Sequence, residues 1–274
     1  MDLSEYIEIA SSTDVGRRYD HNEDSISSVP EHAFVILADG MGGHNAGEVA
    51  SAMAVDYVTQ HVLDYIDKVD TLEMDAETGL TQYSDIVREA VQRANFEIFE
   101  AAKEPKHHGM GTTIVVALMY ENQMTVANVG DSRLYRYVNK SLKQVTKDHT
   151  LLQELVDQGF YTLEEAREAP NKNIVTRGLG AEESVEVDVC EEYISKGEKI
   201  LLCSDGLTDM LEDDEILAIM NKYVHNNQAC VQALINSANE QGGLDNVSAI
   251  IVEVKKNFPS DGKSFSRVLD WLLK

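Results

Sequence analysis

The stretch Val35-Ile36-Leu37-Ala38-Asp39-Gly40-Met41-Gly42-Gly43 decides the fold, because an apolar run of strand length passes directly into an acidic residue and a group of glycines. An unbroken apolar run is typical of a strand that is buried on both faces. Three more aspartates, Asp131, Asp205 and Asp245, lie in the same way beside apolar runs. The sequence therefore predicts four buried strands that each end at a carboxylate.

Short apolar runs elsewhere predict further strands, and longer segments with apolar residues three and four apart predict helices. Strands are expected at 7–10, 33–38, 112–120, 124–129, 134–138, 185–189, 199–203 and 247–254, with the three between 112 and 138 forming an antiparallel meander. Helices are expected at 48–66, 83–102, 151–158, 163–168, 213–223 and 226–241, and 67–81 reads as a solvated connection. Grouped strands with helix pairs between them favour an α+β fold over a doubly wound parallel sheet.

The chain has 274 residues, of which 48 are acidic and 23 basic, so its formal net charge is −25. This balance excludes a nucleic-acid-binding module, which needs clustered Lys and Arg. The hydrophobic content of 43% is typical of one large globular domain. No apolar run has the ~18 residues of a membrane span, and the acidic N-terminus lacks a secretory signal. We expect a cytoplasmic protein, a monomer, whose Cys190, Cys203 and Cys230 are buried reduced thiols.

The carboxylates at the strand ends predict a cation site. In a chain with this net charge, ionised carboxylates gathered at the ends of apolar strands repel one another and raise each other's pKa values. Such a cluster therefore indicates a bound cation. Oxygen ligands from Asp, Glu and a glycine carbonyl suit Mg²⁺ or Mn²⁺. Zinc is disfavoured, since no His or Cys residues cluster at ligand spacing.

Six sequence blocks carry a family resemblance. They are Asn22-Glu23-Asp24, Asp39-Gly40-Met41-Gly42-Gly43-His44, Gly109-Met110-Gly111-Thr112-Thr113, Gly130-Asp131-Ser132-Arg133, Ser204-Asp205-Gly206-Leu207 and Asp245-Asn246. In order and spacing they resemble the signature blocks of the type 2C metal-dependent protein phosphatases. The segment from Asp148 to Gly180 is similar to the flap subdomain of the bacterial serine/threonine phosphatase branch.

The resemblance implies two antiparallel sheets packed as a sandwich, with helix pairs outside, metals at one end and a helical flap subdomain at about 148–180. Residues 1–256 would form the catalytic domain. Residues 257–274 would form a linker and a short amphipathic C-terminal helix. That helix either docks on its own domain or binds a partner.

Carried over position by position, the resemblance makes Asp39 the bridge between two metals. Asp205 and Asp245 would hold the first metal, and Glu23 with the carbonyl of Gly40 would hold the second. The ions would be Mn²⁺ or Mg²⁺.

For the bacterial branch the resemblance implies a third metal, held by Asp131 and again by Asp205. Asp24 would hold waters around the ions, and Asn246 would orient its neighbour. Asp39, Asp205 and Asp24 are thus the expected catalytic carboxylates.

The implied activity is hydrolysis of phosphoserine and phosphothreonine in proteins, opposing a bacterial serine/threonine kinase. A hydroxide between two metals would attack phosphorus without a covalent enzyme intermediate. The same site could instead hydrolyse small phosphoesters, or the chain could be a silent module that binds phosphoproteins. A regulator that dephosphorylates anti-sigma-type antagonists is a further reading, which the flap-like segment disfavours.

Two positions depart from the family pattern. Tyr19 stands where an Arg usually binds the substrate phosphate, with Arg17 and Arg18 just upstream. Either Arg18 reaches the phosphate through a local shift while Tyr19 hydrogen-bonds a phosphate oxygen, or both arginines are plain surface residues and the phosphate is bound more weakly. Met41 occupies the place of the eukaryotic general-acid His. His44 is the nearest replacement, unless a metal-bound water protonates the leaving group.

Overall fold

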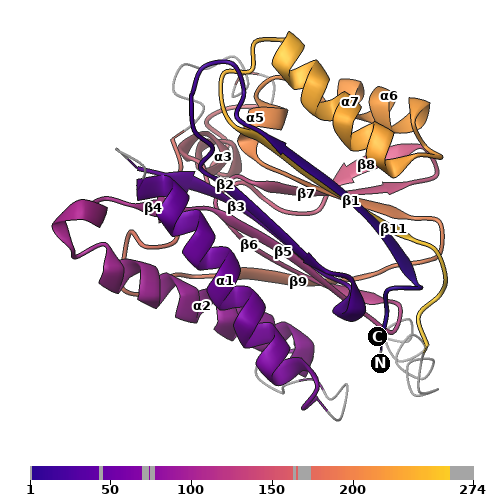
Figure 1. Cartoon of the computed structure of the whole chain (residues 1–274), viewed down its shortest axis with the longest axis horizontal. Helices are drawn as coiled ribbons and strands as arrows, with labels where there is room; N and C mark the ends of the chain where they lie inside the picture. Colours follow the sequence, from indigo (N-terminus) through magenta and orange to yellow (C-terminus); the bar gives the residue numbers. More distant parts are fainter. Residues whose placement is uncertain are drawn as a thin grey trace.

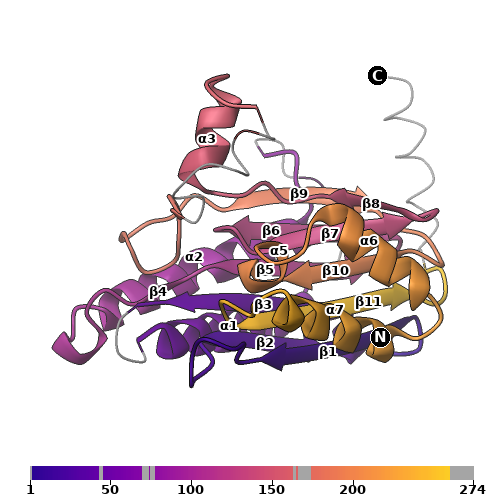
Figure 2. The ribbon, with the colours of Figure 1, turned by 90° about the horizontal axis from the view of Figure 1, so that it is seen from above.

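The computed structural model describes residues 2–42, 46–69, 74, 78–162, 165 and 174–259. Within these residues two antiparallel sheets lie face to face, and a pair of long helices covers each outer face (Figures 1 and 2). One sheet has the order β1 (Ile7–Asp14), β11 (Val247–Val254), β10 (Lys199–Cys203), β7 (Arg133–Val138), β8 (Ser141–Gln144). The other has the order β2 (Asp24–Val29), β3 (Phe34–Met41), β5 (Ile114–Tyr120), β6 (Gln123–Val129), β9 (Asp188–Tyr193), and β4 (Gly111–Thr112) pairs with the end of β3.

The outer helices are α1 (Ala46–Ile66) and α2 (Gln82–Ala101) on one side and α6 (Asp213–Lys222) and α7 (Asn227–Glu240) on the other. Shorter helices are α3 (Leu151–Asp157) and α5 (Asp205–Thr208), with 3-10 turns at Pro30–His32 and Pro105–His107. Side chains cap the starts of α2 and α7, as where the Asn226 carboxamide accepts from the amide of Ala229 at 2.9 Å. The predicted α+β sandwich is therefore confirmed.

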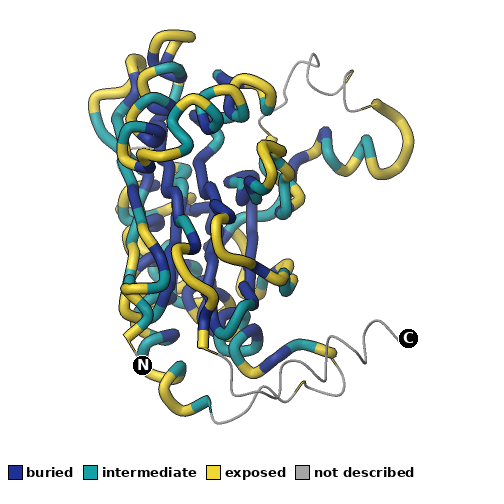
Figure 3. Tube along the Cα trace, turned by 90° about the vertical axis from the view of Figure 1, so that its right-hand side faces the viewer, coloured by how far each residue is buried: buried dark blue, intermediate teal, exposed yellow. Residues whose placement is uncertain are grey.

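Three layers of apolar side chains hold the sandwich together, and they appear as the buried interior of Figure 3. Along β3, Val35 and Leu37 face the other sheet, whereas Phe34, Ile36 and Ala38 face α1 and α2. This alternation follows from the period of two in a strand. Both faces of β3 are therefore buried, which explains why residues 35–38 are all apolar.

The predicted meander is wrong at its third strand. β7 pairs with β10 and β8 in the other sheet and makes no ladder with β6. The chain crosses between the sheets at Gly130-Asp131-Ser132 instead of turning back beside β6, as the predicted meander required. The crossing places Asp131 at the end of both sheets, where the other acidic strand ends lie.

Other differences are smaller. The strand expected at 185–189 is β9 at Asp188–Tyr193, and β2 and β8 were not predicted because their sequences are polar. Cys190 is exposed rather than buried, although Cys203 and Cys230 are buried as expected. The predicted helix at 163–168 lies outside the described residues except for position 165, and the C-terminal helix beyond 259 and His44 lie outside them as well.

The packed domain extends at least to Phe258. Its ring is 3% exposed and stacks on Tyr6 with ring centroids 5.8 Å apart, and its amide donates to the Asn122 carboxamide at 3.0 Å. No helix in the part of the chain described is long and apolar enough to cross a membrane.

Replacing Phe258 by alanine is expected to lower the free energy of unfolding by about 3 kcal/mol, the lower end for a buried aromatic residue, because Phe258 lies near a chain end. Phe160, which is 70% exposed, offers the matched control, and Phe160→Ala should change stability by less than about 0.5 kcal/mol. Urea denaturation measures both. Equal effects would show that Phe258 is not part of the core.

Candidate metal centre

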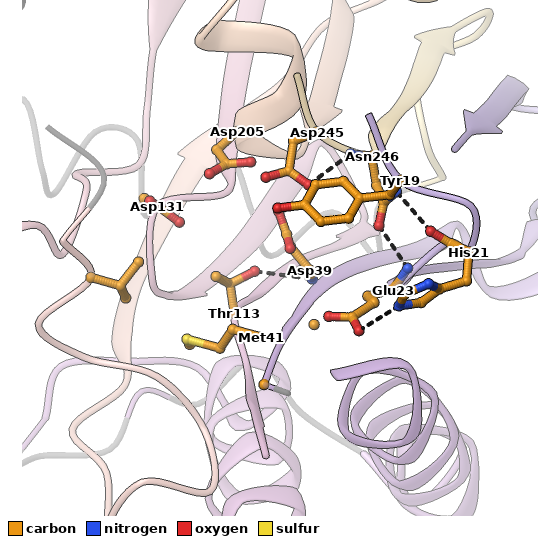
Figure 4. A pocket seen from close by; sticks show the side chains of 13 residues that line it. Tyr19, His21, Glu23, Asp39, Met41, Thr113, Asp131, Asp205, Asp245 and Asn246 are labelled. Carbon is orange, nitrogen blue, oxygen red and sulfur yellow. Dashed lines mark hydrogen bonds and ion pairs between the residues drawn. The ribbon is translucent and has the colours of Figure 1, made fainter. Parts of the chain in front are cut away.

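A cavity of about 530 Å³ opens where the strand ends of the two sheets meet. Its ionisable lining is mostly acidic, as Figure 4 shows: Glu23, Asp39, Asp131, Asp205 and Asp245, together with His21 and Tyr19. These residues come from five separate segments of the chain, and the sandwich brings them to one end. Gly40, Met41, Gly42, Thr113, Val175 and Asn246 complete the lining.

Asp39 is fixed through its backbone. It lies inside β3, two residues before its end, rather than beyond the strand as predicted. The Thr113 hydroxyl accepts from the Asp39 amide at 3.1 Å, and the Thr112 hydroxyl donates to the Asp39 carbonyl at 2.7 Å. The Thr-Thr pair of the sequence block at 109–113 therefore holds the backbone of Asp39 and leaves its carboxylate directed into the cavity.

Asp24 lies beside Asp39 on the neighbouring strand, since the two are register partners between β2 and β3. The Ser204 hydroxyl donates to Oδ2 of Asp24 at 2.8 Å and accepts from the amide of Ser248 at 3.0 Å. Asp24 is only 9% exposed and is not part of the cavity lining. It therefore stands behind the central carboxylate and joins the two sheets through Ser204.

Glu23 is positioned by two residues far away in sequence. The Asn246 side-chain oxygen accepts from the Glu23 amide at 2.7 Å, so the Asp245-Asn246 block also orders the N-terminal loop. Gly47, in the first turn of α1, leaves room for the carboxylate, because a Cβ there would lie 2.2 Å from Oε2 of Glu23. The other carboxylate oxygen lies 3.0 Å from Nε2 of His21.

The base of the flap segment supports the turn that carries Asp131. Arg133 makes a bidentate contact with Asp148, with Nη2 of Arg133 2.7 Å from Oδ2 of the carboxylate. Nδ1 of His149 accepts from the amide of Gly130 at 3.0 Å. Arg177, at the other end of the segment, is paired with Asp188 at 2.7 Å. Both arginines are thus ion-pair residues.

Burial and mutual repulsion raise the pKa values of the clustered carboxyl groups. Burial is the main cause for Asp39 and Asp205, whose pKa values lie well above the ordinary 3.8, and neighbouring aspartates add to it. The pKa values of Asp24 and Asp131 rise to about 6, again mainly through burial. Burial also raises the pKa of Asp245, and the hydrogen bond from the Asn246 amide, followed by the charge of Arg18, opposes this rise.

These groups fit a divalent cation. Oδ1 of Asp24 and Oδ1 of Asp205 are buried without a hydrogen-bond partner, and buried carboxylate oxygens without donors are costly unless a cation satisfies them. Among the described residues no three acidic, His or Cys groups already converge on one point. Mg²⁺-type sites do not need such a cage, because waters and backbone carbonyls supply many of their ligands.

The structure brings together in one cavity Glu23, Asp39, Gly40, Asp131, Asp205, Asp245 and Tyr19, all of which the sequence analysis named. Arg18 is exposed and its charge acts on Asp245, whereas the Arg17 backbone and side chain lie against Gly243. His44 lies outside the described residues.

The sequence analysis missed Asp209. Its charge raises the pKa values of Asp131, Asp205 and Asp245, so it belongs to the same electrostatic cluster. Its amide bonds to the Asp205 carbonyl at 2.7 Å in the short helix α5. The spacing of four residues between the two aspartates would have revealed it, since residues four apart share one face of a helix. His21 and Gly47 carried no comparable sequence signal.

Comparison with known proteins agrees with this geometry. A serine/threonine phosphatase, stp, of Listeria monocytogenes is 42% identical over 246 residues, covering 88% of this chain and 93% of the relative. The crystal structure of the Mycobacterium tuberculosis serine/threonine phosphatase PstP/Ppp superposes with a TM-score of 0.79 at 33% identity, covering 91% of this chain and 99% of that one. The catalytic domain of the phosphatase PstP in complex with two manganese ions gives a TM-score of 0.76 at 34% identity, covering 91% and 99%.

This chain shares its two-sheet sandwich with these enzymes, and the carboxylates gathered at one end of it place the chain in the class of metal-dependent protein phosphatases. The model of the protein phosphatase 2C family matches residues 16–241. The chain belongs to that family.

Proposed function

We propose that this protein is a Mn²⁺- or Mg²⁺-dependent phosphatase that hydrolyses phosphoserine and phosphothreonine in proteins. The observation that carries the proposal is the acidic cavity at the strand ends, where Asp39, Asp131, Asp205 and Asp245 face a common space (Figure 4). The buried Oδ1 of Asp205, which has no donor, and the raised pKa values of Asp39 and Asp205 favour occupation by cations. The named phosphatases that resemble the chain support the same reaction class.

Each carboxylate has a proposed task. Asp39 would be a ligand of two cations, Asp205 and Asp245 would hold one of them, and Glu23 with the Gly40 carbonyl would hold the other. Asp131 and Asp205 would hold a third, and Asp24 would keep the waters around the site in place. The cations supply, when bound, a nucleophile made from water and positive charge next to the phosphoryl oxygens.

The chain's own residues fix this arrangement before substrate arrives. Thr112 and Thr113 hold the Asp39 backbone, and Asn246 holds that of Glu23. Phosphoryl transfer depends mostly on positioning and charge stabilisation, so a rigid acidic cavity matches its demands. A nucleophilic thiol is not needed, and burial raises the pKa values of Cys203 and Cys230, which disfavours the reactive thiolate form.

The test is phosphate release from a phosphothreonine peptide while Mn²⁺ is titrated, with p-nitrophenyl phosphate as the small-ester comparison. The proposal expects metal-dependent turnover and a higher kcat/KM for the peptide. Equal kcat/KM values would favour a phosphatase of small phosphoesters. Metal binding without turnover of either ester would favour a silent module that binds phosphoproteins.

Arg18 is the proposed contact for the substrate phosphate. Tyr19 lines the cavity at the position where the family usually has Arg, and it lacks a positive charge. Arg18 is exposed, and its charge reaches Asp245, so a guanidinium is available at the cavity edge.

Arg18→Ala is therefore expected to raise KM for a phosphopeptide about tenfold, since a charge-assisted hydrogen bond is worth about 1.5 kcal/mol. Arg17→Ala is the matched control, because Arg17 lies against Gly243, and its KM should stay within about twofold. Steady-state kinetics measures both. An unchanged KM in Arg18→Ala would remove Arg18 from phosphate binding.

The substrates of such an enzyme are products of a serine/threonine kinase. We therefore include in the proposal that the protein opposes a kinase of this class, as a monomer in the cytoplasm. Phosphoproteomes compared with and without the gene would test the opposition, because kinase substrates should accumulate phosphate when the phosphatase is lost.

A further inference from the structure

A second cavity of about 540 Å³ adjoins the metal centre. We name it the flanking pocket and define it by its lining: Met41, Phe99, Ala102, Lys103, His108 to Gly111 and Val175 to Ala181. Its walls are the C-terminal end of α2, the turn before β4 and the chain that returns from the flap segment. Most of its accessible lining is apolar, in contrast to the metal centre.

Met41 and Val175 line both cavities and so form the wall between them. The Met41 side chain lies against two glycines. A Cβ at Gly178 would be 2.5 Å from Cε of Met41, and a Cβ at Gly111 would be 3.6 Å from its Cγ. The wall therefore consists of the side chains of Met41 and Val175, and a chain bound in one cavity has to cross only these to enter the other.

The flanking pocket is preformed by backbone hydrogen bonds. Thr112 and Leu179 exchange both of their bonds, at 3.2 and 2.8 Å, which ties the returning chain to β4. The amide of Gly180 donates to the buried Asn95 side chain of α2 at 2.9 Å. Because the pocket is already ordered, ligand binding does not carry the entropy cost of ordering its walls.

The two cavities differ in the charge of the side chains that line them. The charged or titratable side chains that line the flanking pocket are Lys103, His108 and Arg177, all of them basic, although the chain carries 25 excess negative charges. Lys103 is paired with Glu100 and Arg177 with Asp188, so the rim is close to neutral. Such a lining accepts an apolar group and disfavours a Lys or Arg side chain.

We propose that the flanking pocket binds an apolar side chain of the substrate protein, close in sequence to the phosphorylated residue, and thereby selects phosphosites with a bulky apolar neighbour. The inference rests on the proposed function, which places the phosphate in the metal centre. The substrate chain then crosses Met41, and Leu, Met or Phe enters the space between Phe99, Ala102 and Leu179. A small aryl phosphate fills the metal centre alone and does not reach the pocket.

The first test varies the substrate. Phosphothreonine peptides with Ala at all neighbouring positions are compared with peptides that carry one Leu, or one Lys, at each of the three positions on either side. The wild-type protein is expected to show about tenfold higher kcat/KM for Leu at one or two positions on one side only, and a decrease for Lys there. A flat profile would overturn the inference.

The second test varies the pocket. Phe99→Ala should remove most of the Leu preference, whereas kcat and KM for p-nitrophenyl phosphate should stay within about twofold. Phe96→Ala is the matched control, because Phe96 lies on the same helix, is 43% exposed and does not line the pocket. Ala181→Trp, at an exposed position on the rim, should fill the pocket and give the same loss without a cavity in the fold.

The outcomes separate the inference from the proposed function. Equal losses on the peptide and on p-nitrophenyl phosphate would mean that the pocket only supports the metal centre, and would overturn the inference. Hydrolysis of all peptides without any Leu preference would overturn the inference and leave the proposed function intact. No hydrolysis of any phosphoester at saturating Mn²⁺ would remove both.

Discussion

Asp205→Asn is expected to reduce Mn²⁺-dependent phosphate release by a factor of about a thousand or more and, in the same protein, to raise the melting temperature measured in EDTA. Asp205 is the first residue of α5 and lines the metal centre, where it is proposed to hold two of the cations. Metal stabilisation of a phosphoryl transition state is worth several kcal/mol, and each 1.4 kcal/mol changes the rate about tenfold.

The increase in stability has a separate cause. Burial, followed by the charges of Asp131, Asp209 and Asp245, raises the pKa of Asp205 well above its ordinary value. Without metal, this carboxyl group is either ionised among like charges or protonated at a cost, and an amide of the same shape avoids both. A gain of about 1 kcal/mol corresponds to roughly 2–4 °C in a domain of this size.

Asp56→Asn is the control, because Asp56 is exposed on α1 and lies outside the metal centre. It should leave both activity and melting temperature nearly unchanged. Turnover retained in Asp205→Asn would refute the assignment of Asp205. A lower melting temperature of Asp205→Asn in EDTA would show that the Asp205 carboxylate stabilises the metal-free fold.

The metal-free protein is expected to melt at a lower temperature at pH 7.5 than at pH 5.5, by roughly 4–8 °C, which corresponds to about 2 kcal/mol. In the folded chain the pKa values of Asp24 and Asp131 are about 6 instead of 3.8, and those of Asp39 and Asp205 are higher still. The folded state therefore binds more protons than the unfolded state. Their stabilising effect is greatest below pH 4 and is lost as the pH rises through 6.

Saturating Mn²⁺ should reverse this dependence, because a bound cation favours the ionised carboxylates. At a concentration 100 times its dissociation constant the metal adds about 3 kcal/mol of stability. His149 opposes the trend, since burial lowers its pKa and its contribution grows with pH, but it acts equally with and without metal. Scanning calorimetry in EDTA and in Mn²⁺ at both pH values isolates the carboxylates. A melting temperature in EDTA that rises with pH would contradict the assignment of the buried cluster.

The layers of the fold and the acidic cluster could be predicted because their signals are local. β3 is apolar at every buried position, and α1, α2, α6 and α7 repeat apolar residues at helical spacing, so each element stands out alone. The strand-end aspartates are adjacent to these elements in the sequence. Six ordered sequence blocks then fixed how the elements assemble, which periodicity alone does not.

What could not be predicted depends on contacts between distant segments. The passage of β7 into the other sheet depends on its pairing with β10, some 65 residues later in the chain. The roles of Ser204 and Gly47 appear only when Asp24 and Glu23 lie beside them. β2 was missed because only one of its six residues is buried, so its sequence shows no apolar run.

The pairing of the first strand with the last has a consequence for how this protein is made. Ile7 of β1 is the register partner of Val254 of β11, so the two strands join only after residues 247–254 have left the ribosome. Pairings between such distant residues form slowly, because the long loop between them must close first. Asp245, just before β11, reaches the acidic cavity at the same late stage. A nascent chain is therefore expected to stay inactive until residues 245–254 have left the ribosome.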